Sequence, residues 1–203
     1  MGIFDLFRKK ESPDVAFWSW FATNEDRLFY FEKDQEKIFD ELNGKLRAIH
    51  PSVTFEFGPV KQGKREFVIS ADGIREAFPF VERTFEYSPE LDRWIFIKFR
   101  PRRGTFEVKM NGRELSAEYI AFRLEKDGIK IGIELYVRGY DPSERDQYIG
   151  LVFILLDSAI GEFDMETKVG FIELFEWEKM PAEAKNFSEL PETFDQMWAA
   201  SLN

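Results

Sequence analysis

The spacing of apolar residues changes at Pro51. Over residues 35–49 apolar side chains recur every three or four positions, which predicts an amphipathic helix that Pro51 ends. Over residues 53–57 they alternate with polar side chains, which is typical of a half-buried strand. Residues 14–31 have a less regular helical pattern. The chain therefore begins with helices and continues into a sheet.

Further strands follow, and two of the turns between them have strong hairpin sequences. Asn111-Gly112 and Asp127-Gly128 suit type I′ turns, which need positive φ at both central residues. Helices are predicted where Pro79 and Pro142 can occupy first helical positions, and the second of these helices is apolar on nearly every side. The predicted strands cover residues 53–57, 65–71, 94–99, 105–110, 118–124, 129–137 and 167–177.

These elements predict an α+β fold, with a mainly antiparallel sheet of about seven strands and helices packed on it. Two segments, 53–99 and 118–177, each contain a hairpin, a helix and a strand in that order. This suggests a repeated ββαβ arrangement. The alternative is two hairpins that arose independently.

The domain boundaries follow from breaks in the pattern. Residues 1–12 form an amphipathic leader that ends at Ser12-Pro13, and residues 13–179 are expected to form a single α+β domain. After Glu178 the apolar pattern disappears. Residues 180–203 are therefore expected to be a linker and a short helix, either docked or free.

The composition excludes several kinds of chemistry. There is no Cys, so disulfides and thiolate nucleophiles are ruled out, and the single histidine, His50, excludes a site with two His ligands. The sequence implies no metal and no cofactor. Aromatic residues reach 17%, with 23 Phe, which predicts a bulky core.

The formal net charge is −10, which repels nucleic-acid phosphates and suits either solubility or a basic protein partner. The longest apolar run, 149–156, is too short for a membrane span, which needs about 20 residues. Residues 1–10 lack the pattern of a signal peptide. We therefore expect a cytoplasmic protein, although the leader could touch a membrane or a partner weakly.

Three arginines stand close together at the end of a predicted central strand. Arg100, Arg102 and Arg103 could bind an anion, since guanidinium groups recognise carboxylate and phosphate through paired hydrogen bonds. The favoured alternative is pairing with the many surface carboxylates of this acidic chain.

Two carboxylates are weak candidates for acid–base catalysis. Asp157 follows a buried apolar stretch of the predicted helix, and Glu162 follows the Gly161 that should end it. A buried carboxylate needs a partner or a shifted pKa. For Asp157, a structural role in hydrogen bonding to a neighbouring strand is favoured over catalysis.

The aromatic run at residues 17–21 is too dense for one face of a helix. Trp18, Trp20 and Phe21 could therefore include a surface that contacts another protein or a second copy of the chain. Burial in the core is the favoured alternative.

Three segments resemble a bacterial family that is known only as uncharacterised. They are Thr54–Pro59, Ile69–Ile74 and Ile160–Glu162 followed by Thr167–Glu173, and the likeness covers about residues 17–177. The resemblance implies a bacterial cytoplasmic protein. It implies no activity and no site residues.

Together these features favour a non-enzymatic protein-binding or regulatory domain, similar by analogy to immunity proteins that neutralise a basic partner. The alternative is an enzyme or a small-anion-binding protein that uses the three arginines with Asp157 or Glu162.

Overall fold

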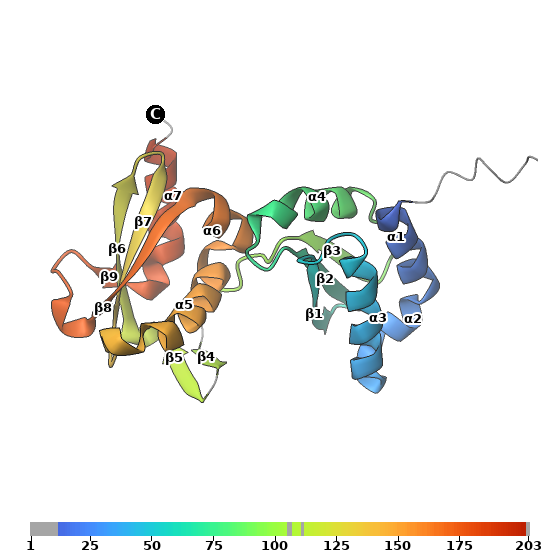
Figure 1. The fold of residues 1–203 in the computed structure, drawn as a ribbon, viewed down its shortest axis with the longest axis horizontal. Helices are drawn as coiled ribbons and strands as arrows, with labels where there is room; N and C mark the ends of the chain where they lie inside the picture. The colour runs from blue at the N-terminus through green and yellow to red at the C-terminus, as the bar shows by residue number, and fades with distance from the viewer. Residues whose placement is uncertain (1–11, 105–106, 111, 202–203) are drawn as a thin grey trace, which may run out of the picture. The chain divides into compact units, whose positions relative to one another are not determined.

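The computed structural model describes residues 12–104, 107–110 and 112–201 (Figure 1). The chain divides into two compact units, an N-terminal unit of residues 1–99 and a C-terminal unit of residues 100–203. The described residues form seven α-helices and nine strands in three sheets. The expected single α+β domain over 13–179 stays a prediction, and the predicted leader lies almost wholly outside the described residues.

The N-terminal unit packs four helices on a sheet with the order β1-β2-β3. Its helices are α1 (Pro13–Thr23), α2 (Glu25–Phe29), α3 (Gln35–Arg47) and α4 (Phe78–Glu86), and its strands are β1 (Thr54–Lys61), β2 (Lys64–Ser70) and β3 (Trp94–Lys98).

The C-terminal unit contains a two-stranded sheet and a four-stranded sheet with the order β8-β7-β6-β9. Its strands are β4 (Glu107–Met110), β5 (Arg113–Ser116), β6 (Ile120–Asp127), β7 (Lys130–Val137), β8 (Val169–Glu176) and β9 (Lys185–Asn186), and its helices are α5 (Arg145–Ile160), α6 (Glu162–Lys168) and α7 (Leu190–Ser201).

The prediction of one mainly antiparallel sheet of about seven strands was wrong, because the strands form three separate sheets. The two larger sheets are also mixed: β1–β2 and β6–β7 pair antiparallel, whereas β3 runs parallel to β2 and β8 runs parallel to β7. A helical connection causes this, since it returns the chain to the end of the sheet where the previous strand began. In the segments 53–99 and 118–177 the first two strands pair antiparallel and the strand after the helix runs parallel to the second, and a repeated ββαβ arrangement stays a prediction.

Aromatic side chains fill the core of the N-terminal unit. Phe67 of β2 lies 4.9 Å from Phe21 of α1 and 6.3 Å from Phe17, measured between ring centroids. The helix α1 begins at Pro13, where the Ser12 hydroxyl caps the backbone N–H of Val15. The irregular apolar pattern over residues 14–31 is therefore explained by two successive helices, α1 and α2.

In the C-terminal unit, α5 and α7 pack on one face of the four-stranded sheet (Figure 1). Leu155 of α5 and Phe194 of α7 are fully buried against the strands. Residues 190–201 are thus part of the core, although their sequence left docking open. Although α5 is apolar on nearly every side, it is not buried all round, since Phe153 and Ile154 are each 41% exposed.

The hairpin between β6 and β7 forms one residue later than its sequence predicts. Asp127 pairs with Lys130, so Gly128 and Ile129 make the turn, and Ile129 is 84% exposed instead of lying in the strand. Met110 pairs with Arg113 in the hairpin of β4 and β5. Of that predicted turn, Asn111 lies outside the described residues, as do residues 105–106 of the predicted strand.

Candidate functional site

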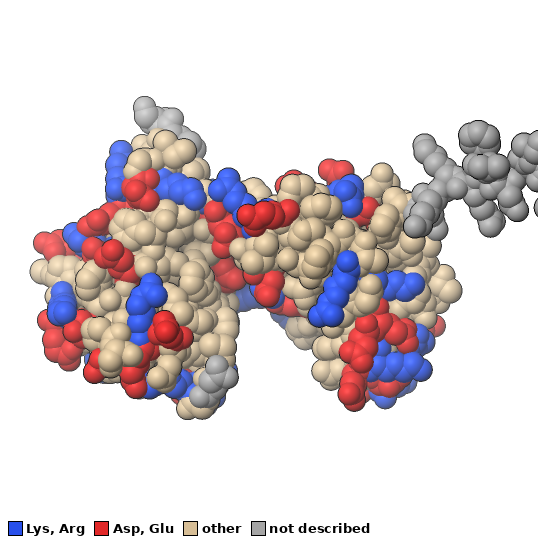
Figure 2. Space-filling view, viewed as in Figure 1, with Lys and Arg blue, Asp and Glu red and all other residues tan. Residues whose placement is uncertain are grey.

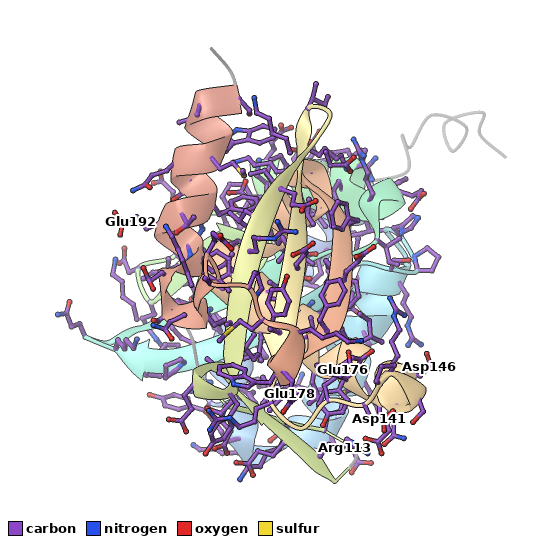
Figure 3. All side chains as sticks on the ribbon, turned by 90° about the vertical axis from the view of Figure 1, so that its left-hand side faces the viewer. Arg113, Asp141, Asp146, Glu176, Glu178 and Glu192 are labelled. Atoms are coloured by element: carbon purple, nitrogen blue, oxygen red, sulfur yellow. The ribbon has the colours of Figure 1, made fainter. Side chains whose placement is uncertain are left out.

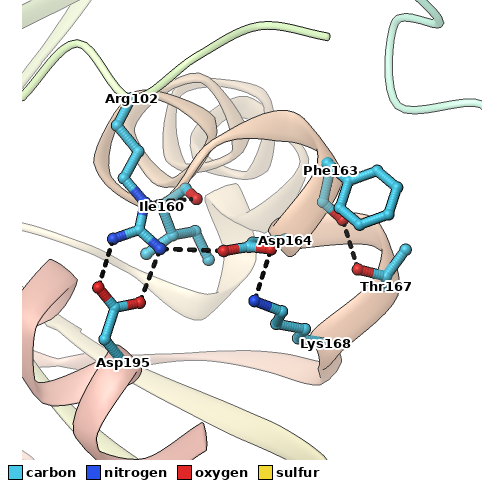
Figure 4. Close-up of polar contacts among 7 residues, drawn as sticks. All are labelled: Arg102, Ile160, Phe163, Asp164, Thr167, Lys168 and Asp195. Atoms are coloured by element: carbon cyan, nitrogen blue, oxygen red, sulfur yellow. Dashed lines mark hydrogen bonds and ion pairs between the residues drawn. The ribbon is translucent and has the colours of Figure 1, made fainter. Parts of the chain in front are cut away.

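Arg102, one of the three candidate arginines, is already held by groups of its own unit (Figure 4). Its Nη1 and Nη2 each donate to Asp195 of α7 at 2.8 Å, and Nη2 also donates to Asp164 of α6 at 3.0 Å. Its Nε donates to the carbonyl oxygen of Ile160 at 2.9 Å, at the end of α5. The guanidinium group therefore joins three helices.

The charges around Arg102 are balanced internally. The hydrogen bonds from Arg102 lower the pKa of the Asp195 carboxyl and raise the pKa of the guanidinium group. Asp164 also accepts from Lys168 at 2.7 Å. Arg102 thus behaves as a structural ion pair, which is the alternative that the sequence favoured over an anion site.

The other candidates of this region meet mainly through the backbone. Glu162 is fully buried and accepts from the backbone N–H of Arg100 at 2.9 Å, while its own N–H donates to the Arg100 carbonyl at 3.0 Å. The N–H of Arg103 donates to Ser158 at 2.8 Å. Asp157 is half-buried on α5. The structure thus gathers this region around the end of α5, where these hydrogen bonds join residues 100–103 to α5 and α6.

Of the three aromatic candidates, two are buried. Phe21 is fully buried, and Trp18 is 4% exposed, with its Nε1 donating to the carbonyl of Thr84 at 2.6 Å. Only Trp20 is partly exposed. Trp18 and Phe21 are therefore core residues, and their side chains are not offered to a partner.

Two small cavities open on the N-terminal unit. One, of about 250 Å³, is lined by polar residues that include Asn43, Arg47 and Asp72. The other, of about 270 Å³, lies beside Tyr30 and Ile38. Small-molecule sites usually occupy about 300–1,000 Å³. Both cavities are below that range, so neither favours a ligand-binding function.

Metal chemistry has no support in the part of the chain that the structure describes, where no group of three or more acidic or His residues could hold an ion. The lone His50 stacks on Phe80 at 4.5 Å between ring centroids, and its Nδ1 accepts from the backbone N–H of Ser52. No helix among the described residues is long and apolar enough to cross a membrane.

The larger sheet of the C-terminal unit has a second face, on which none of the described α-helices packs (Figures 1 and 3). We call it the open face. The pairing register places matched residues of β6, β7 and β8 side by side on it. Its side chains are Arg123, Glu125, Glu134, Tyr136, Phe171, Glu173 and Phe175.

An ion pair lies at the centre of the open face. Arg123 donates from Nε and Nη2 to the two carboxylate oxygens of Glu134 at 2.7 and 2.8 Å, and the Tyr136 hydroxyl donates to Glu134 as well. Glu134 is only 7% exposed, whereas the side chains of Arg123 and Glu125 are 40% and 39% exposed. The Nη2 of Arg123 also donates a hydrogen bond to the carboxylate of Glu125. The guanidinium group therefore covers a buried carboxylate and presents its own outer edge to solvent.

This arrangement shifts the pKa values of Glu134 and Tyr136. The hydrogen bonds from Arg123 lower the pKa of Glu134 although burial opposes that shift. Burial raises the pKa of Tyr136 to about 12, and the neighbouring Glu134 adds to the rise. At neutral pH the centre is thus a fixed Arg⁺–Glu⁻ pair with a neutral phenol, which suits recognition better than proton transfer.

Acidic side chains gather where β8 ends. Asp141 and Glu176 are close enough for Asp141 to affect the pKa of Glu176, and Figure 3 shows Asp146 and Glu178 nearby. Glu176 is bonded by Lys179 at 2.9 Å, but Asp146 and Glu178 form no ion pair with the described residues. Figure 2 shows charged side chains of both signs on the visible surface, with uncharged areas between them. Residues 100–203 carry most of the chain's negative excess.

Sequence reasoning missed the open face. Glu134 stands inside the alternating run of β7, where alternation marks the side of the sheet that faces away from the core. The pairing of Glu134 with Arg123 follows from the observed hairpin register, whereas a turn at Asp127-Gly128 would pair Arg123 with Gly132. The alternation therefore indicated that Glu134 faces away from the core, but its partner on β6 could be identified only once the strand register was known.

Comparison of the chain with protein-family models, with curated proteins and with solved structures found no match. The resemblance to an uncharacterised bacterial family stays a prediction.

Proposed function

We propose that the chain is a non-enzymatic protein-binding domain, and that the open face of its C-terminal unit, with the acidic residues at the end of β8, captures a basic partner protein. The observation that carries the proposal is a sheet on which the described α-helices pack against one face only. Its other face combines the aromatic side chains of Phe171 and Phe175 with a fixed ion pair at Arg123. Aromatic residues and Arg are enriched in the centres of protein interfaces.

The charge distribution supports a basic partner. Glu173 lies exposed on the open face and forms no ion pair with any described residue, and Glu176 at the end of β8 has Asp141 close to it. Complementary charge speeds the encounter of two proteins and selects against partners of like charge. By analogy with immunity proteins, the partner could be a toxic protein that the chain neutralises.

A photo-crosslinking experiment tests this function. A benzophenone amino acid is placed at Glu173 of the full chain in bacterial cells, and the matched control carries it at Glu90, an exposed residue of the N-terminal unit. We expect irradiation to join one discrete basic protein to the Glu173 variant and not to the Glu90 variant. Equal labelling from both positions, or no discrete product from Glu173, would contradict the proposal.

A further inference from the structure

Strand β8 is a free edge of the four-stranded sheet. Seven of its eight residues pair with β7 on one side, and the described residues place no strand on the other side. A bulge at Gly170 interrupts the pairing near the start, because Val169 pairs with Ile131 and Phe171 with the next residue, Gly132. Residues 171–176 therefore form a regular edge with which no described strand pairs, and the segment Pro142–Glu144 lies close to β8.

The other edges of the described sheets carry features that discourage further pairing. Strand β1 contains Pro59 and Lys61 and has a bulge between Phe57 and Val60. Strand β3 has five residues and ends in Lys98, and β9 has only two residues. Short strands, Lys, Pro and bulges all protect an edge. Strand β8 contains no Lys, Arg or Pro.

The two rows of side chains on β8 differ in chemistry. Ile172 and Leu174 pack against the core cluster but remain partly exposed, so apolar side chains of an added strand would extend the core beside them. On the open face, Glu173 stands exposed between Phe171 and Phe175. An added strand would place one of its side chains beside Glu173, where a basic residue fits.

Taking up the proposed function, we propose that β8 binds an extended basic segment of the partner as an additional strand, with alternating apolar and Lys or Arg side chains. Backbone hydrogen bonds give affinity in this mode, and alternate side chains give specificity. A second copy of this chain fits less well, because the same acidic residues of two chains with a net charge of −10 would be brought together.

The test uses the full chain and a labelled peptide of about ten alternating Val and Lys residues. Binding is measured by fluorescence anisotropy, and amide hydrogen exchange locates the site. We expect binding that weakens with salt, together with protection of the amides in residues 171–176. A matched Val/Glu peptide should not bind. Protection elsewhere, without protection of β8, would overturn the inference.

Two N-methylated versions of the Val/Lys peptide separate strand addition from simple attraction of charges. Methyl groups on alternate amides remove the donors on one edge while the charge stays the same. We expect one version to lose binding and the other to retain it. If both bind like the unmodified peptide, strand addition is excluded, whereas capture of a basic protein at Glu173 would still stand on its crosslink.

A charge reversal provides the matched variants. Glu173→Lys should weaken the Val/Lys peptide about five-fold, since opposite-charge pairs across strands contribute up to about 1 kcal/mol. Glu118→Lys makes the same change at an exposed residue before β6 and should bind as the wild type does. Thermal unfolding shows whether both variants remain folded. Equal loss in the two variants, or a dimer detected by light scattering with β8 protected in it, would overturn the proposal.

Discussion

The ring of Phe171 on β8 occupies the space that a side chain on Gly132 of β7 would need. The two residues are matched in register, and an ideal Cβ built on Gly132 would lie 2.2 Å from both Cε1 and Cζ of Phe171. Glycine at this position therefore allows the aromatic ring to lie across the neighbouring strand. This packing helps to shape the open face next to the edge that we assign to a partner.

Gly132→Ala should destabilise the C-terminal unit. The new methyl group forces Phe171 or β8 to move, and overpacking of this kind typically costs about 1–3 kcal/mol. Urea unfolding followed by hydrogen exchange in β7 and β8 measures the loss. The Val/Lys peptide should also bind this variant more weakly, since β8 no longer keeps its position.

Gly44→Ala is the matched control, because it makes the same chemical change in the helix α3 of the other unit. A Cβ at Gly44 would meet nothing within 4 Å, and Ala is favoured over Gly in a helix interior by about 1 kcal/mol. This variant should therefore be more stable than the wild type. A Gly132→Ala protein that unfolds at the wild-type urea concentration would show that Phe171 yields without cost.

The elements of the fold were more predictable than their assembly. The helix α3 follows from the spacing of Ile38, Leu42 and Leu46, and the hairpin of β6 and β7 follows from its turn. Both depend on residues that are close in sequence. The parallel pairing of β8 with β7 depends instead on how α5 returns the chain, and no local sequence pattern predicts it.

The candidate site also combines features that are local in the sequence with contacts between distant residues. Arg102 could be recognised as a charged residue from the sequence, but its partner Asp195 is distant in the chain and lies on α7, a helix whose docking the sequence left open. The ion pair of Arg123 and Glu134 is local to one hairpin. It was missed because the predicted turn at Asp127-Gly128 would pair Arg123 with Gly132 instead of Glu134.

Acidification should weaken the C-terminal unit through Glu134. Its pKa is lowered from 4.5 in the folded protein, mainly by the hydrogen bonds from Arg123, so its contribution to stability is present above about pH 4.5 and is lost as the pH falls through the folded value. Unfolding in urea at a series of pH values measures this slope. Glu134→Gln should be less stable at neutral pH and should depend less on pH in the acidic range.

Glu173→Gln is the control for this pH series, since Glu173 lies exposed on the same face and forms no ion pair with the described residues. It should keep the wild-type dependence on pH. If Glu134→Gln also keeps it, the pair with Arg123 is too well hydrated to contribute.

Alkaline pH should affect Tyr136. Its pKa is raised to about 12 from 10.0, mainly by burial, so the folded state disfavours the phenolate. The resulting stability is fully present below about pH 10 and is lost as the pH rises through 12. Ultraviolet titration of the wild type and of Tyr136→Phe should reveal one tyrosine that ionises later than the exposed ones. A difference spectrum without a late-ionising group would contradict the buried hydrogen bond to Glu134.

Arg102→Lys should loosen α7 even though the charge is kept. A Lys ammonium group cannot reproduce the paired hydrogen bonds to Asp195 together with the bond to the Ile160 carbonyl. Hydrogen bonds to charged groups contribute about 1.5–3 kcal/mol, and solvent screening of this partly exposed side chain reduces the expected loss to about 1–2 kcal/mol. Faster amide exchange in residues 190–201 measures it. Arg145→Lys, at an exposed arginine of α5 that forms no ion pair with the described residues, should leave that exchange unchanged.

The C-terminal helix should be essential for folding of its unit. Leu190 and Phe194 are fully buried in the core, and β9 pairs with Ala121 and Phe122 of β6. A chain that ends at residue 179 would leave this surface exposed. We therefore expect the truncated protein to lose cooperative unfolding and fixed side-chain packing in residues 100–179, measured by hydrogen exchange and near-ultraviolet circular dichroism.

Phe194→Ala tests the same relationship without shortening the chain. Removal of a fully buried phenyl ring typically costs about 3–5 kcal/mol, because the surrounding side chains only partly fill the cavity. Gln196→Ala, two residues further along α7, removes an exposed side chain that bonds only Glu192 and should change stability by less than about 0.5 kcal/mol. If both variants and the truncated chain unfold as the wild type does, residues 190–201 do not contribute to the stability of the C-terminal unit.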